Sequence, residues 1–377
     1  MPAESNAPRV IGATNEYFRG FRVMNACNLL YVINDLRMGG AQVGMARLLN
    51  GLDDERYDVT VVTIDGYDKT FVEQRLPTVE SILDCKRVRT PRDVSRLVSA
   101  VASADVIVGS LYHASILTRV AGVVNRDATV ATWHHNERFK TLFREMLFKT
   151  TSPLSDVVLA DSEPVAKILC GELGLADDVV ESVPIAGIPL SEFEPREHDN
   201  TGPITVGSVG VISGQKNFRN LVSMAVELED EDVIFRIVGD GPEKETIACW
   251  IETIGVENIE LLGSVRELPT FLNSVDIYVQ PSRFEGLCIT VVEAMAAGLP
   301  IVGSAVGGIR HNVRNGKCGY VHDPDDIEGF CRSIRELAAN PSKRQRFGDH
   351  GREYVEQHYS QRVLVEEFEQ AIHRPSR

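Results

Sequence analysis

The chain lacks the features that would place it in a membrane or outside the cell. It has no apolar run of about eighteen residues, the length that a membrane-spanning helix needs, and its N-terminus lacks the hydrophobic core of a secretory signal. Its seven cysteines are scattered, without a CxxC pair, so neither a disulfide framework nor a cysteine metal site is expected. We therefore expect a cytoplasmic protein with reduced cysteines.

The chain also lacks a surplus of positive charge. It has 39 Lys and Arg against 54 Asp and Glu, a net charge of −15, which argues against a general nucleic-acid binder. Hydrophobic residues at 43% and charged residues at 25% are ordinary globular values. At 377 residues, the chain is expected to form two domains of roughly 150–200 residues, each with its own core.

Short β-branched segments alternate with longer amphipathic segments along the whole chain. Strands that are apolar on both faces and separated by helices predict parallel sheets covered on both sides, and hence an α/β protein with two doubly wound domains. The predicted strands of the first half are Leu29–Asn34, Val59–Ile64, Val106–Val108, Thr129–Thr132 and Val157–Leu159. Those of the second half are Ile204–Val209, Ile234–Val238, Ile259–Leu261, Ile277–Gln280 and Ile301–Val302.

Composition and periodicity also predict the domain boundaries. Residues 1–27 lack clear periodicity and are predicted to be a mobile extension, followed by an N-terminal domain over 28–190. The polar, Pro- and Gly-bearing segment 191–203 suits a linker, and 204–354 forms the C-terminal domain. The last helix, at about 355–377, is expected to pack back on the N-terminal domain.

Two glutamates flank the start of a predicted helix in the second half. Glu285 follows a buried strand and a Pro281-Ser282 break, and Glu293 lies about two turns into the helix. At about 1.5 Å per residue, their carboxylates would be roughly 10 Å apart along the axis, with a phosphate-favouring helix N-terminus between them. This spacing suits an extended ligand composed of a sugar, a diphosphate and a ribose.

Glu285 and Glu293, together with the Ala294–Val302 segment that follows, resemble the signature of glycosyltransferase family 4, over about twenty consecutive positions. The resemblance implies the GT-B fold, in which two Rossmann-like domains face a central cleft. The N-terminal domain would hold the acceptor side and the C-terminal domain would bind the nucleotide-sugar.

Loops after the predicted strands of the first half also match the family. The Gly39-Gly40 turn resembles the loop that faces the donor diphosphate, although glycine pairs before helices are also common turn chemistry. The resemblance implies that His113 lies near the transferred sugar and that His134 lines the same cleft. His135 is interpreted as structural, and no HExxH spacing indicates a metal.

The first loop of the second domain departs from the family pattern. Lys216 matches the lysine that neutralises the diphosphate, but Val211 stands where the family has an arginine. Either Arg283 or Arg219 compensates, or donor binding is weakened. The resemblance implies His113, Glu285 and Lys216 as catalytic residues. The donor-binding residues would be Gly39, Gly40, Gly210, Lys216, Arg283, Glu285, Gly286, Leu287 and Glu293.

The function implied by the resemblance is retaining transfer of a sugar from a nucleotide-sugar, UDP- or GDP-linked, to an acceptor hydroxyl on a glycan or lipid-linked molecule, without metal or cofactor. Two alternatives remain open. A glycoside hydrolase would need Glu285 and Glu293 to be about 5–9.5 Å apart across one bond. A non-catalytic member of the fold, binding sugar nucleotides or acting as a scaffold, is made credible by Val211.

The segment 138–149 is basic and rich in Phe and Leu with helical spacing. Such a stretch can lie on an anionic membrane beside a lipid-linked acceptor, which would place the protein peripherally at the inner membrane face. A core-packing helix with a basic outer face is the alternative interpretation.

Overall fold

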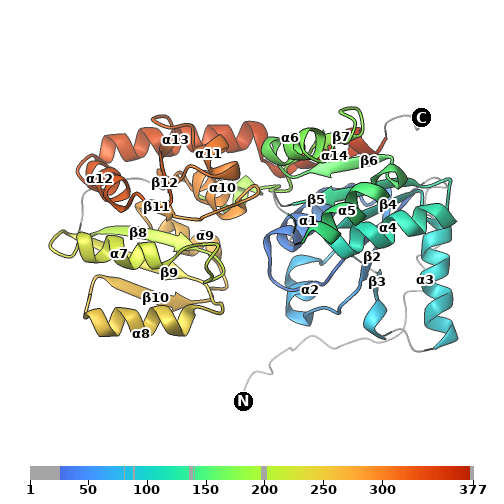
Figure 1. The fold of residues 1–377 in the computed structure, drawn as a ribbon, viewed down its shortest axis with the longest axis horizontal. Coiled ribbons are helices and arrows are strands. Elements are labelled where there is room, and N and C mark those ends of the chain that lie inside the picture. The colour runs from blue at the N-terminus through green and yellow to red at the C-terminus, as the bar shows by residue number, and fades with distance from the viewer. Residues whose placement is uncertain are drawn as a thin grey trace, which may run out of the picture.

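The computed structural model describes residues 26–79, 81–87, 90–135, 139, 141–196 and 202–373. These residues form two α/β domains side by side (Figure 1), and the predicted pair of doubly wound domains is confirmed. Most of the extension predicted over 1–27, and residues 197–201 of the predicted linker, lie outside the described residues. In the described part of the chain, no helix combines the length and the hydropathy needed to cross a bilayer.

The described part of the N-terminal domain contains a seven-stranded sheet in the order β3-β2-β1-β4-β5-β6-β7, in which every pairing is parallel. Its strands are β1 (Cys27–Ile33), β2 (Tyr57–Thr63), β3 (Ser81–Asp84), β4 (Val106–Ser110), β5 (Thr129–His134), β6 (Val157–Ala160) and β7 (Val180–Ser182). Its helices are α1 (Gly40–Gly51), α2 (Lys69–Arg75), α3 (Pro91–Ser103), α4 (Tyr112–Val124), α5 (Leu142–Thr151) and α6 (Glu163–Gly171).

The described part of the C-terminal domain contains a six-stranded parallel sheet in the order β10-β9-β8-β11-β12-β13. Its strands are β8 (Ile204–Val209), β9 (Val233–Val238), β10 (Ile259–Gly263), β11 (Ile277–Gln280), β12 (Ile301–Ser304) and β13 (Gly319–His322). The helices from here to the end of the chain are α7 (Arg219–Glu227), α8 (Lys244–Ile254), α9 (Leu268–Asn273), α10 (Ile289–Ala296), α11 (Gly307–Val313), α12 (Ile327–Ala338), α13 (Pro341–His358) and α14 (Gln361–Ile372).

The central strands of both sheets are buried on both faces, as the apolar strands predicted. Every residue of β4, β6, β11 and β12 is buried. Three strands, β3, β7 and β13, have no counterpart in the sequence prediction. They have four, three and four residues and lie at or beside a sheet edge, where partial exposure replaces the continuous apolar pattern.

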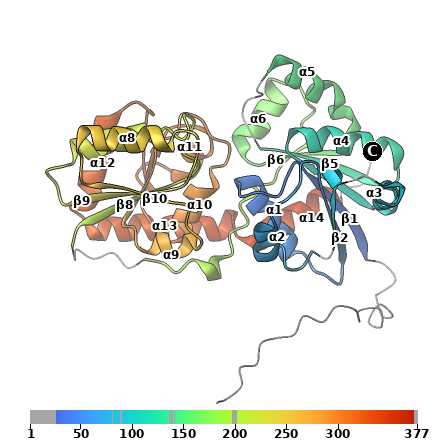
Figure 2. The same cartoon turned by 90° about the horizontal axis from the view of Figure 1, so that it is seen from below.

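The chain crosses between the domains twice, and the two crossings lie against each other. Ile188 donates its backbone N–H to Tyr359 O (2.7 Å) and accepts a hydrogen bond from Gln361 N (3.0 Å). Helix α13 runs along the C-terminal domain, and α14 continues onto the N-terminal domain (Figure 2). There Phe368 is buried and stacks on Trp133 with 5.9 Å between ring centroids, so α14 forms part of the N-terminal core.

Candidate functional site

The topology brings four of the loops singled out in the sequence to the switch points of the two sheets. In each sheet two strands that are not consecutive lie side by side, β1 with β4 and β8 with β11. Loops leaving such a pair run to opposite faces and leave a crevice where ligands of open α/β sheets bind. These loops carry Gly39 and Gly40, His113, Lys216, and Glu285.

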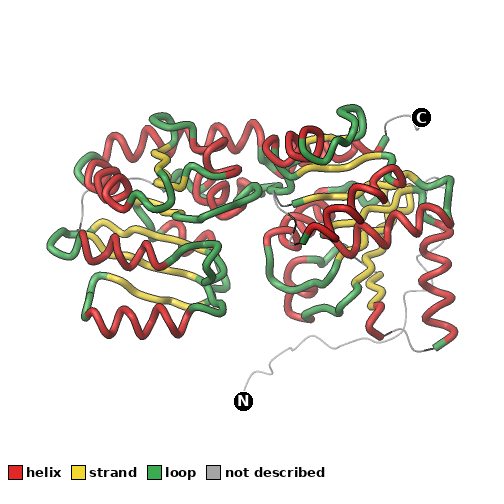
Figure 3. The backbone as a smooth tube through the Cα atoms, in the orientation of Figure 1, coloured by secondary structure: helices red, strands yellow, loops and turns green. Residues whose placement is uncertain are grey.

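Loops of both domains lie along the boundary between them (Figure 3). A Cβ atom on Gly40 would lie 3.6 Å from Cδ1 of Ile289, the first residue of α10. The N-termini of α1 and α10 therefore approach each other from opposite domains. Neither helix has an acidic residue in its first turn or a side-chain cap, so both ends favour an anion between them.

Lys216 and Glu285 form a buried ion pair within the C-terminal domain. Lys216 Nζ lies 2.8 Å from Glu285 Oε1, and their side chains are 15% and 7% exposed. The same carboxylate oxygen accepts a hydrogen bond from Ser282 Oγ (2.6 Å), which in turn accepts one from Gln280 Nε2 (2.9 Å). This chain of contacts fixes the direction of the Glu285 carboxylate, because each partner is itself buried.

Gly210 leaves room for the stem of Lys216. Its φ of 157° lies in a region that side chains rarely adopt, and a Cβ there would lie 3.1 Å from Lys216 Cε. A side chain at position 210 would therefore crowd the stem of Lys216, which would have to shift by a few tenths of an ångström.

Burial by itself would lower the pKa of Lys216, but the neighbouring Cys288 and Glu285 outweigh burial and raise the pKa above its usual value. The Cys288 thiol is 3.8 Å from Nζ, and burial raises its pKa to about 12, so near neutral pH the negative partner of Lys216 is Glu285. The ammonium group is therefore charged near neutral pH.

Glu293 is paired across the domain boundary with a residue that the sequence analysis did not identify. Arg47 Nη2 lies 2.5 Å from Glu293 Oε1, and Nη1 donates to Ala186 O (3.0 Å), next to the first interdomain crossing. Both side chains are about nine-tenths buried or more. An arginine on an amphipathic helix is usually solvated, so no motif around Arg47 indicated this contact.

The three histidines of the N-terminal strand ends have different surroundings. His113 is exposed in the first turn of α4, after Leu111, whose φ of 74° is strained for a residue with a side chain. His134 is buried, with ring centroids 4.8 Å from Phe139 and 5.0 Å from Phe148. The predicted roles of His113 and His134 stay predictions.

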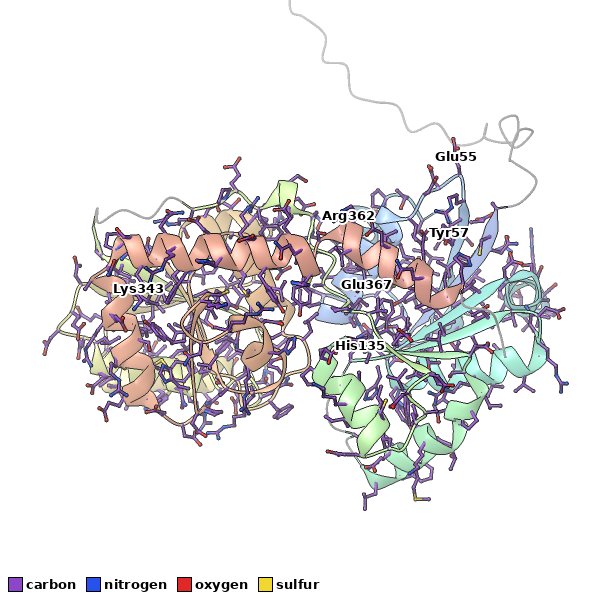
Figure 4. The ribbon with its side chains drawn as sticks, turned by 90° about the horizontal axis from the view of Figure 1, so that it is seen from above. Glu55, Tyr57, His135, Lys343, Arg362 and Glu367 are labelled. Atoms are coloured by element: carbon purple, nitrogen blue, oxygen red, sulfur yellow. The ribbon has the colours of Figure 1, made fainter. Side chains whose placement is uncertain are left out.

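His135, interpreted as structural from the sequence, lies at the junction between the two domains (Figure 4). A Cβ on Gly286 would lie 2.4 Å from His135 O, so the loop that carries Glu285 contacts this part of the N-terminal domain. Sequence reasoning also missed Asp161, whose carboxylate is beside the His135 ring, because a lone aspartate after a short strand carries no motif.

The two arginines proposed to compensate for Val211 are both engaged elsewhere. Val211 is 56% exposed on the loop after β8. Arg283 pairs with Asp325 (3.0 Å) and Arg219 with Glu243 (3.9 Å), both as exposed or half-exposed contacts. Such contacts contribute little free energy, so a phosphate ligand can displace either carboxylate.

Comparison with known proteins gives matches to both halves of the chain. Residues 38–185 match the model of Glycosyltransferase Family 4, and residues 191–354 match that of Glycosyl transferases group 1. The 2-deoxystreptamine glucosyltransferase of Streptomyces kanamyceticus is 29% identical over 197 residues, 48% of this chain and 51% of that protein. An uncharacterized glycosyltransferase of Haemophilus influenzae is 23% identical over 354 residues, 89% of this chain and 97% of that protein.

The chain spans about half the length of the first curated relatives it matches. Among solved structures, Anabaena HepE in complex with UDP and glucose is similar over 92% of this chain and 99% of that chain, with a TM-score of 0.80 and 17% identity. A glycosyltransferase from Rickettsia africae is similar over 93% of this chain, with a TM-score of 0.77 and 14% identity. These structural likenesses show the same two-domain GT-B fold.

Proposed function

Because the chain belongs to the group 1 glycosyltransferases of glycosyltransferase family 4, we propose that it transfers a sugar from a nucleotide-sugar to an acceptor hydroxyl with retention at the anomeric carbon. The observation that carries the proposal is the buried Lys216–Glu285 pair beside the uncapped N-terminus of α10. This arrangement offers a fixed cation and helix N–H groups to a diphosphate, and a fixed carboxylate to sugar hydroxyls.

In this proposal the donor lies along α10. Lys216 and the α10 N-terminus hold the diphosphate, Glu285 accepts hydrogen bonds from the sugar, and Glu293 accepts them from the ribose. Gly39 and Gly40 bring the N-terminus of α1 to the diphosphate from the other domain, and His113 reaches the transferred sugar. Stabilising the charge on the departing diphosphate is the main catalytic contribution, and a preorganised cation supplies it without reorganisation.

The nucleotide is proposed to be a UDP- or GDP-sugar. UDP has the further support that Anabaena HepE was crystallised with UDP and glucose and with UDP-glucose. We also propose that the reaction is independent of metal, because Lys216 and two helix N-termini provide positive charge at the diphosphate. Excess EDTA should then leave the rate unchanged, and a rate that Mg²⁺ restores after EDTA would contradict this part of the proposal.

The geometry supports the two alternative functions less well. A glycoside hydrolase would need one glutamate free to protonate a leaving group. Glu285 is instead paired with Lys216, and Glu293 with Arg47. A non-catalytic protein remains the alternative that Val211 favours, and it would bind the nucleotide-sugar without hydrolysing or transferring it.

Calorimetry with UDP, GDP and their common sugar conjugates tests the proposal. Binding of one nucleotide in the micromolar to millimolar range typical of enzyme substrates is expected, and it should weaken in Glu293→Ala and Lys216→Ala. Lys244→Ala is the matched control, since Lys244 pairs with Asp240 in the same domain and is more exposed. If no nucleotide binds, or if free sugar binds alone, the proposed donor site is wrong.

We further propose that the N-terminal domain contacts an anionic membrane through α5 and its neighbours. Within the described part of segment 138–149, Leu142, Phe143 and Met146 are 79%, 72% and 65% exposed. Residues 86–149 hold eleven Lys and Arg, of which Arg119 is buried, against five Asp and Glu in a chain whose net charge is −15. Exposed apolar side chains within a locally basic region suit the interface of an anionic bilayer, where a lipid-linked acceptor would be found.

A further inference from the structure

Three polar side chains stand together at the ends of β4, β5 and β6, which are neighbours in the N-terminal sheet. Ser110 ends β4, while His135 and Asp161 directly follow β5 and β6. Ser110 Oγ and His135 Nε2 share a hydrogen bond of 2.8 Å, and His135 Nδ1 lies 3.7 Å from Asp161 Oδ2. Parallel strands end at the same edge of a sheet, so this edge presents a hydroxyl, an imidazole and a carboxylate in a row.

The row is buried, yet part of its hydrogen-bonding capacity is unused. Asp161 is 4% exposed, and the His135 side chain is 8% exposed. Among the described residues, Asp161 Oδ1 has no hydrogen-bond partner, while His135 and Ser162 both interact with the same carboxyl group. Leaving a buried polar atom unpaired costs about 1–3 kcal/mol, so Asp161 Oδ1 calls for a hydrogen-bond donor that is not protein.

The C-terminal domain closes over this row with the loop that carries Glu285. A Cβ on Gly286 would lie 2.4 Å from His135 O and 3.3 Å from Asp161 Oδ2, so only glycine allows the loop to come this near. Burial raises the pKa of the Asp161 carboxyl, His135 and Ser162 lower it, and the nearby Glu285 raises it further. The Asp161 carboxyl is therefore close enough to Glu285 of the other domain for the charge of Glu285 to act on it.

We propose that Asp161 and His135 form a hydroxyl-binding subsite on the N-terminal domain, opposite Glu285, that takes a hydroxyl group of a sugar. The inference rests on the proposed function and adds residues that the motifs do not include. Asp161 accepts from the hydroxyl through Oδ1, His135 contributes Nδ1, and Ser110 fixes the ring from the other side. The hydroxyl belongs either to the sugar of the donor or to the acceptor.

Asp161→Asn keeps the shape of the side chain and removes its charge. The probes are UDP and UDP-glucose, or GDP and GDP-mannose if wild-type protein prefers guanine. If the hydroxyl is the donor's, the affinity for the sugar nucleotide falls roughly tenfold or more while that for the free nucleotide is unchanged. If it is the acceptor's attacking hydroxyl, water takes its place in donor hydrolysis, so both affinities hold and turnover in hydrolysis falls by a similar factor with the KM for donor unchanged.

Asp156→Asn is the matched control, because Asp156 is an exposed carboxylate at the other end of β6 that accepts from Val130 N. It should leave all three quantities as in wild type. Should Asp161→Asn not fold, His135→Gln tests the same prediction with the same measurements. The inference is overturned if wild type binds the sugar nucleotide and the variant matches it in both affinities and in turnover. If wild type binds no nucleotide, it is the proposed donor site that is wrong.

Discussion

Arg47 of α1 and Glu293 of α10 form a buried ion pair that joins the two domains, with 2.5 Å between Nη2 and Oε1. A buried pair is weak evidence of net stabilisation, but removing one partner leaves the other charge unpaired and costs about 3–5 kcal/mol. The same arginine donates to Ala186 O beside the interdomain crossing. Arg47 therefore links the N-terminal domain, the interdomain crossing beside Ala186 and the carboxylate proposed to bind ribose.

We expect Arg47→Ala to lower the free energy of unfolding by about 3–5 kcal/mol, measured by urea denaturation. The double variant Arg47→Ala/Glu293→Ala should lose less than the sum of the two single variants, because it leaves no unpaired charge. Arg56→Ala is the control: Arg56 pairs with Glu369 at 3.1 Å but is 56% exposed, so its loss should cost about 1 kcal/mol or less. If the double variant loses the sum of the free energies that the two single variants lose, Arg47 and Glu293 are not coupled.

Lys216→Met should reduce kcat of sugar transfer by about a hundredfold to a thousandfold, the usual cost of removing one preorganised group that stabilises developing negative charge. The side chain remains of similar length, so Gly210 still accommodates it, but Glu285 loses its buried partner and we expect the melting temperature to fall. The measurement is steady-state transfer or donor hydrolysis, with the melting temperature as a check on folding. Activity within threefold of wild type would show that Lys216 does not neutralise the diphosphate.

The raised pKa of Glu367 on α14 predicts that stability depends on pH between about 4.5 and 7 (Figure 4). Burial, with the nearby Glu366, raises the pKa of its carboxyl from 4.5 to about 7. The folded state therefore binds more protons than the unfolded state between these two values, and stability falls as the pH rises from about 4.5 to 7. Glu367→Gln should raise the melting temperature at pH 8 and lose that advantage towards pH 4.5.

The exposed Glu356 on α13 provides the control for this titration, because Glu356→Gln removes a carboxylate that is in water in both states. Its melting temperature should differ from wild type by a similar small amount at both pH values. If Glu367→Gln raises the melting temperature equally at pH 5 and pH 8, the titration of Glu367 is not the cause of the stabilisation.

The sequence predicts those parts of the site whose residues belong to a pattern of neighbouring residues in the chain. The strand–loop–helix unit around Glu285 and Glu293 was readable, because apolar runs and a Pro-Ser break are properties of neighbouring residues. Sequence patterns could not predict the contacts of Arg47 and Asp161 or the position of His135 against Gly286. Each of these contacts joins segments that are more than twenty residues apart. Val211 was recognised as a departure from the family, but the partners of Arg283 and Arg219 depend on folding.

Gly286 tests whether the contact between the domains is needed for catalysis. A methyl group at this position would overlap His135 O, so Gly286→Ala should hold the two domains apart and lower turnover at least tenfold. Small-angle scattering should show a larger radius of gyration than for wild type. Gly171→Ala is the matched control, because a Cβ there meets nothing within 4 Å. Unchanged scattering and turnover would exclude a role for this contact.

The proposed membrane surface predicts that α5 anchors the protein through apolar side chains as well as charge. We expect wild type to co-sediment with vesicles containing phosphatidylserine, more weakly as salt is raised, and not with neutral vesicles. The double variant Leu142→Ser/Phe143→Ser should lose most of this binding, since two side chains that are 79% and 72% exposed no longer enter the interface. Leu262→Ser removes an exposed leucine from β10 of the other domain and should bind as wild type does. If Leu142→Ser/Phe143→Ser binds these vesicles as well as Leu262→Ser does, charge alone brings the protein to the bilayer and α5 does not insert.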